Sequence, residues 1–381
     1  MQTKIKSNFE KLLDDGSFSN SQKEIKEKNF NKFLEKGFPN KRIEDWKFSD
    51  LNQIISTNFE NLAFSKKDNQ SSIDINFINE FDHNKIVFVD GKISKVDFSY
   101  ENEDKISLEK DLELDNELNE NVLLNLNTAF LSKYIKITIN KGYQFKKPLI
   151  LYNYLTPDLE SHCLNMRLDI NLEDDASIDV LNISNKNVKN NFLNFRQKIN
   201  IGKNSVLKNY SLDINPTSNI KYSFKDINLD KNSHLEYFVY SKGSQFAKHD
   251  INCSLNSDYG SVALNGIIDL DNKKHHEIKT VINHNEENCK SYQLSRALLL
   301  NDDVEFNAKP ELEIYADDVK CSHGSTSGNI DENSIFYLMS RGLSHIQSKR
   351  LLTNGFLNEV IEKITNEAVK SLIKKLTGIK E

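Results

Sequence analysis

The chain has 381 residues and a formal net charge of −6, and 38% of its residues are hydrophobic, which is enough to bury a core. An acidic chain of this kind is not expected to bind nucleic acid non-specifically. No apolar run approaches the roughly 18 residues that a membrane span requires, and the N-terminal residues MQTKIKSNFEKLL lack the apolar segment of a signal peptide. The sequence therefore predicts a soluble protein without a membrane or nucleic-acid partner.

The four cysteines lie far apart in the sequence, at Cys163, Cys253, Cys289 and Cys321. They include no C-x-x-C pair, so they form neither a disulfide framework nor a self-contained zinc or iron–sulfur motif. This pattern predicts a cytoplasmic protein whose cysteines stay reduced.

Residues 1–64 are expected to form a helical region. Residues 21–24 have the pattern of a capping box, and the amphipathic run that follows them ends at Gly37. Residues 65–129 are expected to form a polar connecting region with some β structure. Within it, residues 86–89 are a candidate strand that leads into an Asp-Gly turn.

The pattern changes to strands between residues 130 and 330. Short apolar strands repeatedly end in a polar turn with a serine, and 28 residues separate each of Ser177, Ser205, Ser233 and Ser261 from the next. A repeat of this length with strands and turns but no helix favours a β-solenoid, in which each coil buries its inward residues against its neighbours. The alternative is a sandwich of hairpin strands whose regular spacing is a coincidence.

Two groups of polar residues in this region invite a metal-binding or catalytic interpretation. The first includes His276 and His284, but these would lie roughly 26 Å apart on a straight strand, so they cannot share a metal without a turn. The second consists of two carboxylate pairs, Asp302 with Asp303 and Asp317 with Asp318. Paired carboxylates cleave glycans in some enzymes, but adjacent residues on a strand point to opposite faces. A Walker A loop and a G-x-G-x-x-G dinucleotide motif are both absent from the sequence.

Cys321 and His323 lie two residues apart, at the end of a strand-like run that contains Leu312, Ile314 and Val319. Residues at this spacing share one face of a strand, so a thiolate and an imidazole there could ligate one metal. Two ligands do not fill a tetrahedral site, and the remaining ligands would have to come from elsewhere. Two alternatives are a nucleophile with its base and a buried, inert cysteine beside a hydrogen-bonded histidine.

Residues 331–381 are expected to return to helix. Asp331 is the candidate N-cap of one helix, and a second capping box begins at Ser344. Apolar residues then recur at a spacing of three and four, at Leu357, Val360, Ile361, Ile364, Ala368, Leu372 and Leu376. A stripe of this length caps the solenoid, docks on a partner, or does both.

Two segments resemble the SufB/SufD family, the β-helical scaffold subunits of the SUF iron–sulfur cluster assembly machinery. Residues 309–342 have the sequence KPELEIYADDVKCSHGSTSGNIDENSIFYLMSRG, which is similar to the most characteristic stretch of that family. The CSHGSTSG part is similar to the SufD version, whereas SufB-type chains carry an acidic Glu-His-Glu-like triplet there. Residues 41–51, KRIEDWKFSDL, contain the only tryptophan, Trp46, and resemble the N-terminal helical motif of SufD. The chain departs from the family near Gln293, where about one coil of sequence is missing.

The resemblance implies a mostly β fold, with a right-handed parallel β-helix between N- and C-terminal helical regions. It also implies a complex with a SufB-like paralogue and a SufC-like ABC ATPase. In this family the last β-helix strands of SufB and SufD pair across an interface. Cys321 and His323 are expected to contribute there to a transient iron or iron–sulfur cluster site that the two subunits share.

The ATPase is expected to dock on the C-terminal helices, and its ATP-driven dimerisation would then rearrange the interface. The residues expected at this docking site are Ser344, Phe356, Leu357, Val360, Ile361 and Ile364. These expectations describe a non-enzymatic scaffold subunit, for which a self-dimer is possible in isolation. The contrasting hypothesis is a stand-alone β-solenoid enzyme that uses Cys321 or the aspartate pairs and needs no partner.

Overall fold

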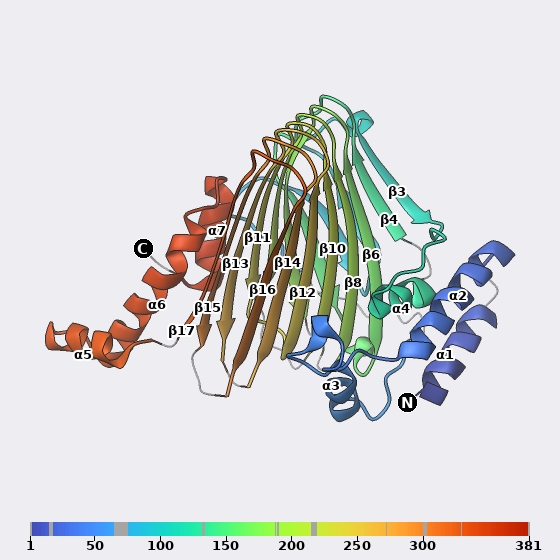
Figure 1. Ribbon diagram of the computed structural model, residues 1–381, viewed down its shortest axis with the longest axis horizontal. Coiled ribbons are helices and arrows are strands. Elements are labelled where there is room, and N and C mark those ends of the chain that lie inside the picture. The colour runs from blue at the N-terminus through green and yellow to red at the C-terminus, as the bar shows by residue number, and fades with distance from the viewer. Residues whose placement is uncertain are drawn as a thin grey trace.

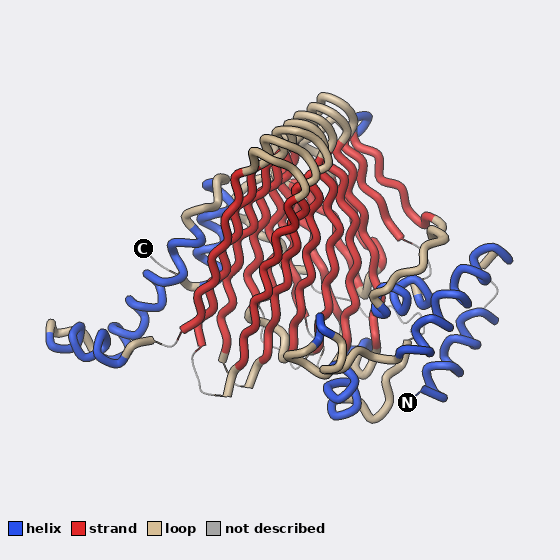
Figure 2. The backbone as a smooth tube through the Cα atoms, viewed as in Figure 1, coloured by secondary structure: helices blue, strands red, loops and turns tan. Residues whose placement is uncertain are grey.

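The computed structural model describes residues 2–14, 18–64, 75–131, 134–186, 188, 190–214, 219–271, 273–299, 303–328 and 330–379. Within these ranges a long stack of strands forms the body of the molecule, and helices lie on either side of it (Figures 1 and 2). The strands make a parallel β-solenoid of about six turns. The prediction of a mostly β fold with a solenoid core and terminal helices is confirmed.

The solenoid consists of two sheets, and each coil contributes one strand to each of them. The strand order is β17-β15-β13-β11-β9-β7-β5-β1-β2 in one sheet, called sheet B here, and β16-β14-β12-β10-β8-β6-β4-β3 in the other, called sheet C. The strands are β1 Asn84–Val89, β2 Lys92–Asp97, β3 Ile106–Leu112, β4 Tyr134–Ile139, β5 Leu149–Leu155, β6 Cys163–Leu172, β7 Ser177–Lys186, β8 Phe192–Ile201, β9 Val206–Asp213, β10 Ile220–Leu229, β11 His234–Ser241, β12 Phe246–Leu255, β13 Ser261–Leu270, β14 His275–His284, β15 Lys290–Leu299, β16 Glu305–Ile314 and β17 Lys320–Gly328. Antiparallel strands, β2 and β3, end the two sheets on the N-terminal side.

One corner of each coil contains a residue with positive φ. These residues are Asp175, Asn204, Asn232, Tyr259, Asn288 and Asp318. Aspartate and asparagine enter this backbone region more readily than most residues, which explains why five of the six are Asp or Asn. Their spacing varies from 27 to 30 residues, so the repeat has no constant length.

The four serines that revealed the repeat do not occupy equivalent positions. Ser177 and Ser261 are the first residues of β7 and β13, whereas Ser205 and Ser233 come immediately before β9 and β11. The spacing of 28 is therefore close to the mean of a variable repeat. The solenoid inference was correct, but the turn residues with positive φ are its better marker.

Apolar side chains fill most of the space between the two sheets. Alternate residues of each strand point inward, as Ile251, Cys253 and Leu255 do on β12. The outer face of sheet C is covered by the N-terminal helices, and the outer face of sheet B is covered by the C-terminal helices. The solenoid thus has an apolar core inside and a second apolar layer on each outer face.

The N-terminal helices are α1 Gln2–Asp14, α2 Asn20–Lys36 and α3 Leu51–Asn58, with a short 3₁₀ helix, η1, at Glu44–Trp46. The capping box expected at residues 21–24 is wrong. Helix α2 begins two residues earlier than that box requires, and its N-cap is Ser19, whose hydroxyl accepts a hydrogen bond from the Gln22 backbone N–H. Its end at Gly37, where φ is positive, agrees with the sequence.

The connecting region contains more regular structure than its polar sequence suggested. Strand β1 pairs with β5 and β3 pairs with β4, so both sheets begin before residue 130. The candidate strand at residues 86–89 lies within β1, and Asp90 and Gly91 form the turn into β2 with positive φ at both positions. Helix α4, Val122–Phe130, was not predicted, because every one of its residues is buried and it shows no polar face.

The C-terminal helices are α5 Glu332–Ser340, α6 His345–Ile361 and α7 Glu367–Thr377. Asp331 and Ser344 cap α5 and α6 as predicted, and the capping box at Ser344 is complete. The apolar stripe is not one continuous helix, because the chain turns between α6 and α7. Ala368 is exposed and Val369 is the buried residue at that point. Among the described residues, no helix is both long and apolar enough to cross a membrane.

Candidate functional site

Cys321 and His323 lie on β17, the last strand of sheet B. The register of β17 on β15 places Cys321 beside Ser291 and His323 beside Gln293. Ser291 and Gln293 are buried inward-facing residues, so Cys321 and His323 share that direction. Cys321 is partly exposed and His323 is exposed, because no later coil of the described chain covers them.

The local structure expected around this pair is wrong in one respect. Leu312 and Ile314 were expected to lie on the strand that ends at the pair, but they lie on β16, in the opposite sheet. The CSHGSTSG segment forms a strand of its own. Its small polar residues have no alternating apolar pattern, so the sequence could not reveal it.

Strands β16 and β17 form an open end of the solenoid. In the part of the chain that the structure describes, β16 pairs only with β14 and β17 only with β15. Each therefore has one row of backbone N–H and C=O groups without a neighbouring strand. Apolar side chains are exposed at the same end, with exposed fractions of 50% for Ile314 and 70% for Tyr315. An edge of this kind is a template for strands of another chain.

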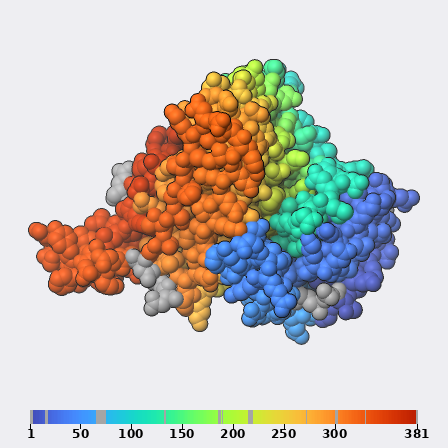
Figure 3. Space-filling model, in the orientation of Figure 1, coloured from blue at the N-terminus to red at the C-terminus, as the bar shows by residue number. Residues whose placement is uncertain are grey.

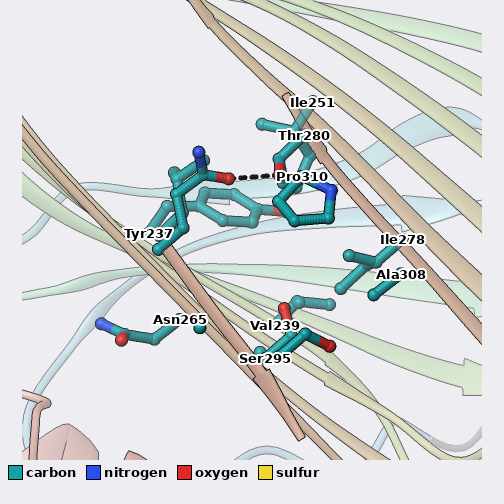
Figure 4. Close-up of a pocket in the computed structure, with 14 residues that line it drawn as sticks. Tyr237, Val239, Ile251, Asn265, Ile278, Thr280, Ser295, Ala308 and Pro310 are labelled. Carbon is teal, nitrogen blue, oxygen red and sulfur yellow. Dashed lines mark hydrogen bonds between the residues drawn. The ribbon is translucent and has the colours of Figure 1, made fainter. Parts of the chain in front are cut away.

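A polar layer lies one coil beneath the Cys321/His323 pair. The Thr280 hydroxyl donates a hydrogen bond to Gln293 Oε1 across the interior, and His284 Nε2 lies 2.8 Å from Ser291 Oγ. Beside this layer is a cavity of about 10 Å³, enough for roughly one water molecule. Figure 4 shows the cavity between the two sheets, with Tyr237, Val239 and Ser295 on one side and Thr280, Ala308 and Pro310 on the other. The interior below the pair thus contains polar groups, as it also does further down the solenoid, where Lys225 Nζ donates to Gln197 Oε1 at 2.8 Å.

The other three cysteines do not join this site. Cys163, Cys253 and Cys289 are buried, and burial raises the pKa of each thiol, which favours the unreactive protonated form. Among the described residues, no three or more His, Cys, Asp or Glu side chains come together in a way that could hold a metal ion. Within the described residues, Cys321 and His323 could therefore supply only two of the ligands that a metal site requires.

The histidines near residue 280 form contacts within the solenoid. His276 is fully buried, with Nδ1 3.0 Å from Ser241 Oγ and Nε2 2.7 Å from the Ser244 carbonyl oxygen. Burial lowers the pKa of His276 to about 4. His275 is on the opposite face of β14, where its Nε2 is 3.0 Å from Glu277 Oε1. The two neighbouring histidines thus cannot act on one ligand.

The aspartate pairs do not form a two-carboxylate site in the described structure. Asp317 and Asp318 are exposed on the corner before β17, where Asp318 is the residue with positive φ. Asp303 is exposed, and Asp302 lies outside the described residues. The described geometry thus provides no support for glycan cleavage by these carboxylates.

Most of the residues expected to dock a partner instead attach α6 to the solenoid. Leu357, Val360, Ile361 and Ile364 are at most 2% exposed and pack on the outer face of sheet B. Ser344 is exposed and Phe356 is half-buried. In this chain by itself the four buried residues supply no exposed contact area, and the docking site that includes them stays a prediction.

The exposed apolar residues of the C-terminal region lie on α5 and the first half of α6. Their exposed fractions are 73% for Phe336, 57% for Tyr337, 79% for Ile346 and 52% for Leu351. Helix α5 projects away from the solenoid (Figure 1). Sequence reasoning missed this surface, because the pattern of apolar residues does not show which helix packs on the sheet.

Helix α6 is connected to β15, the neighbour of β17. Arg296 on β15 contacts α6 twice: its Nη2 is 2.5 Å from Glu359 Oε2, and its Nη1 donates to the Phe356 carbonyl oxygen at 3.0 Å. Beyond α6, the Thr365 hydroxyl donates to Glu236 Oε2 at 2.6 Å. A force on α6 would therefore reach the strand that supports Cys321 and His323.

Comparisons with known proteins agree with this architecture. The family model described as SUF system FeS cluster assembly, SufBD core domain, matches residues 154–297 and 290–356. The two matched segments overlap on β15, the strand that contains Gln293. The iron–sulfur cluster assembly protein SufD of Escherichia coli is 25% identical over 379 residues, which cover 89% of this chain and 88% of that protein.

Two further proteins are similar to this chain, one over most of its length and one over a short segment. An iron–sulfur cluster assembly SufBD family protein of Synechocystis is 23% identical over 382 residues, which cover 86% of this chain and 84% of that protein. The chloroplastic protein ABCI7 of Arabidopsis thaliana is 44% identical over 78 residues, which cover 20% of this chain and 16% of that protein. The matched family model spans more than half of the chain and includes the strand with Cys321 and His323. The chain therefore belongs to the SufB/SufD family of the SUF iron–sulfur cluster assembly system, as a SufD-type member.

Proposed function

We propose that this chain is a non-enzymatic scaffold subunit that acts in the cytoplasm and pairs with a SufB-like paralogue at the open end of its solenoid. At that interface Cys321 and His323 bind iron or a nascent cluster, which is the cargo of the complex. The remaining ligands come from the partner. A SufC-like ABC ATPase docks on the C-terminal helices and drives the rearrangement that forms or releases the cluster.

The position of Cys321 and His323 is the observation that carries this proposal. Both residues lie on an edge strand that has no outer neighbour in the described chain, and both face the interior at its open end. A thiolate and an imidazole are suitable ligands for iron and for clusters. Since the described chain supplies only these two, pairing with another subunit would complete the ligand set.

The C-terminal helices support the second part of the proposal. The exposed apolar residues of α5 and α6 form a surface suited to a protein partner. Ser344 and Phe356 are close to these residues in the sequence. Arg296 connects α6 to β15, and β15 carries β17. Movement of a docked ATPase would thus be transmitted to the Cys321/His323 pair through one strand.

Anaerobic purification of the tagged chain from its own cells tests the proposal. We expect a SufB-like chain and an ABC ATPase to co-elute, with a native mass above that of the monomer or dimer. Cys321→Ala and His323→Ala should leave this assembly intact and reduce the cluster absorbance that the complex acquires with iron and sulfide. Cys163→Ala, in a buried thiol far from the open end, is the matched control. Elution without either partner, or normal cluster formation in both variants, would refute the proposal.

A further inference from the structure

The N-terminal motif around Trp46 reaches across the outer face of sheet C to the open end of the solenoid. Here we call residues 41–49 the strap. Trp46 is 4% exposed and packs against Tyr222 on β10 and Phe246 on β12, with ring centroids 5.8 and 6.4 Å away. Lys248 Nζ lies 5.0 Å from the centre of the Trp46 ring. Trp46 therefore anchors this end of the strap on the outer face of sheet C, two to three strands away from the open edge at β16.

The other end of the strap is fastened to the last two strands of sheet C. Asp45 Oδ1 lies 2.6 Å from Lys279 Nζ on β14 and 3.3 Å from Lys309 Nζ on β16. The Glu44 carboxylate lies 3.7 Å from the same Lys309 ammonium group. In the space-filling view, blue N-terminal residues lie directly against the orange strands of the last coils (Figure 3). The strap thus runs from β10 to the open edge at β16.

Residues 41–44 of the strap are exposed to solvent beside this edge. All four are exposed, and Ile43 has an apolar side chain with 39% of its surface accessible. A strand that pairs with β16 would lie about 4.8 Å beyond it. Because Asp45 already bridges β14 and β16, the residues just before it are within reach of that next strand.

We propose that the strap is part of the partner interface, and that Ile43 and Glu44 contact the strand of the SufB-like partner that pairs with β16. The inference rests on the proposed function, since it requires a partner at the open end. It adds a second contact surface on the outer face of sheet C, separate from the inward-facing Cys321/His323 pair. The N-terminal region thereby helps to select the partner.

Site-specific photo-crosslinking tests the inference in the co-expressed complex. The photoreactive residue p-benzoylphenylalanine replaces Ile43 in one sample, Ile314 at the end of β16 in a second, and Leu118 in a third. Leu118 is the negative control: it is 56% exposed, and its neighbour Glu117 pairs with Arg196 on β8, several strands from the open edge. We expect crosslinks to the partner from positions 43 and 314 and none from position 118.

The three positions distinguish the possible failures. A crosslink from position 314 without one from position 43 would overturn the inference and leave the proposed function standing. No crosslink from either position would remove the partner from the open end and overturn both. As a second measurement, Ile43→Asp should weaken partner binding by about tenfold or more, since a charge would replace an apolar contact. Leu118→Asp should not weaken it, and equal affinities for the two variants would contradict the inference.

Discussion

Acidification should destabilise this protein through His276, a residue of the solenoid interior. His276 is 0% exposed, and its two ring nitrogens contact Ser241 and the Ser244 carbonyl. Burial lowers its pKa from 6.5 to about 4 in the folded chain. In the unfolded chain the imidazole returns to a pKa of about 6.5. Between these two values the unfolded state binds more protons, so stability decreases as the pH falls.

The size of the effect follows from the two pKa values. Linkage gives a loss of about 2 kcal/mol in the free energy of unfolding between pH 7.5 and pH 5 from this one residue. His276→Asn removes the titrating group and keeps a polar side chain of similar shape. The variant should be less stable than the wild type at pH 7.5, by about 1–3 kcal/mol, since it loses buried hydrogen bonds. On acidification to pH 5, however, it should lose about 2 kcal/mol less than the wild type.

Urea unfolding followed by circular dichroism at pH 7.5 and pH 5 measures both quantities. His345→Asn, at an exposed position at the start of α6, is the control and should lose as much stability as the wild type. If His276→Asn and the wild type lose equal stability between the two pH values, then His276 is not kept neutral by burial and this reasoning fails.

Four further substitutions, one of them with a matched control, test the packing of the solenoid and its attached helices. Trp46→Ala should lower the free energy of unfolding by about 3–5 kcal/mol, whereas Phe48→Ala, at a 39% exposed position on the same strap, should cost less in the same urea titration. Gly202→Ala should destabilise by about 1–3 kcal/mol or more, because its Cβ would lie 2.8 Å from a backbone oxygen of the previous coil. Gly355 lies in α6, where an added Cβ would meet nothing within 4 Å, so Gly355→Ala should raise the free energy of unfolding by about 0.5–1 kcal/mol. Thermal unfolding should therefore show a lower melting temperature for Gly202→Ala and a higher one for Gly355→Ala. Arg296→Met should raise amide hydrogen exchange in α6 and leave exchange in α2 unchanged, and an unchanged α6 would show that this arginine does not hold the helix.

Local sequence features were sufficient where the chain contacts mainly its own neighbours. The strand-and-turn repeat identified the solenoid, because each coil stacks only on the coils beside it. Asp331 and Ser344 were recognisable as helix caps, since a cap is made within one turn of the chain. The pair Cys321 and His323 was identifiable by its chemistry, and the similarity of the surrounding residues to SufD pointed to its family.

Features that depend on distant residues could be decided only by the tertiary structure. Helix α4 has no polar face because other segments surround it completely, and no local pattern indicates that. The apolar stripe of the C-terminal region predicted a helix surface, but only the packing on sheet B shows that Val360 and Ile361 are buried while Phe336 and Ile346 are exposed. Asp45 reaches Lys279 and Lys309 across more than 230 residues of sequence. The sequence by itself thus determined the repeat, the caps of α5 and α6, and the candidate ligands. The tertiary structure decided which surfaces are covered and which edge stays open, because burial depends on residues far apart in the chain.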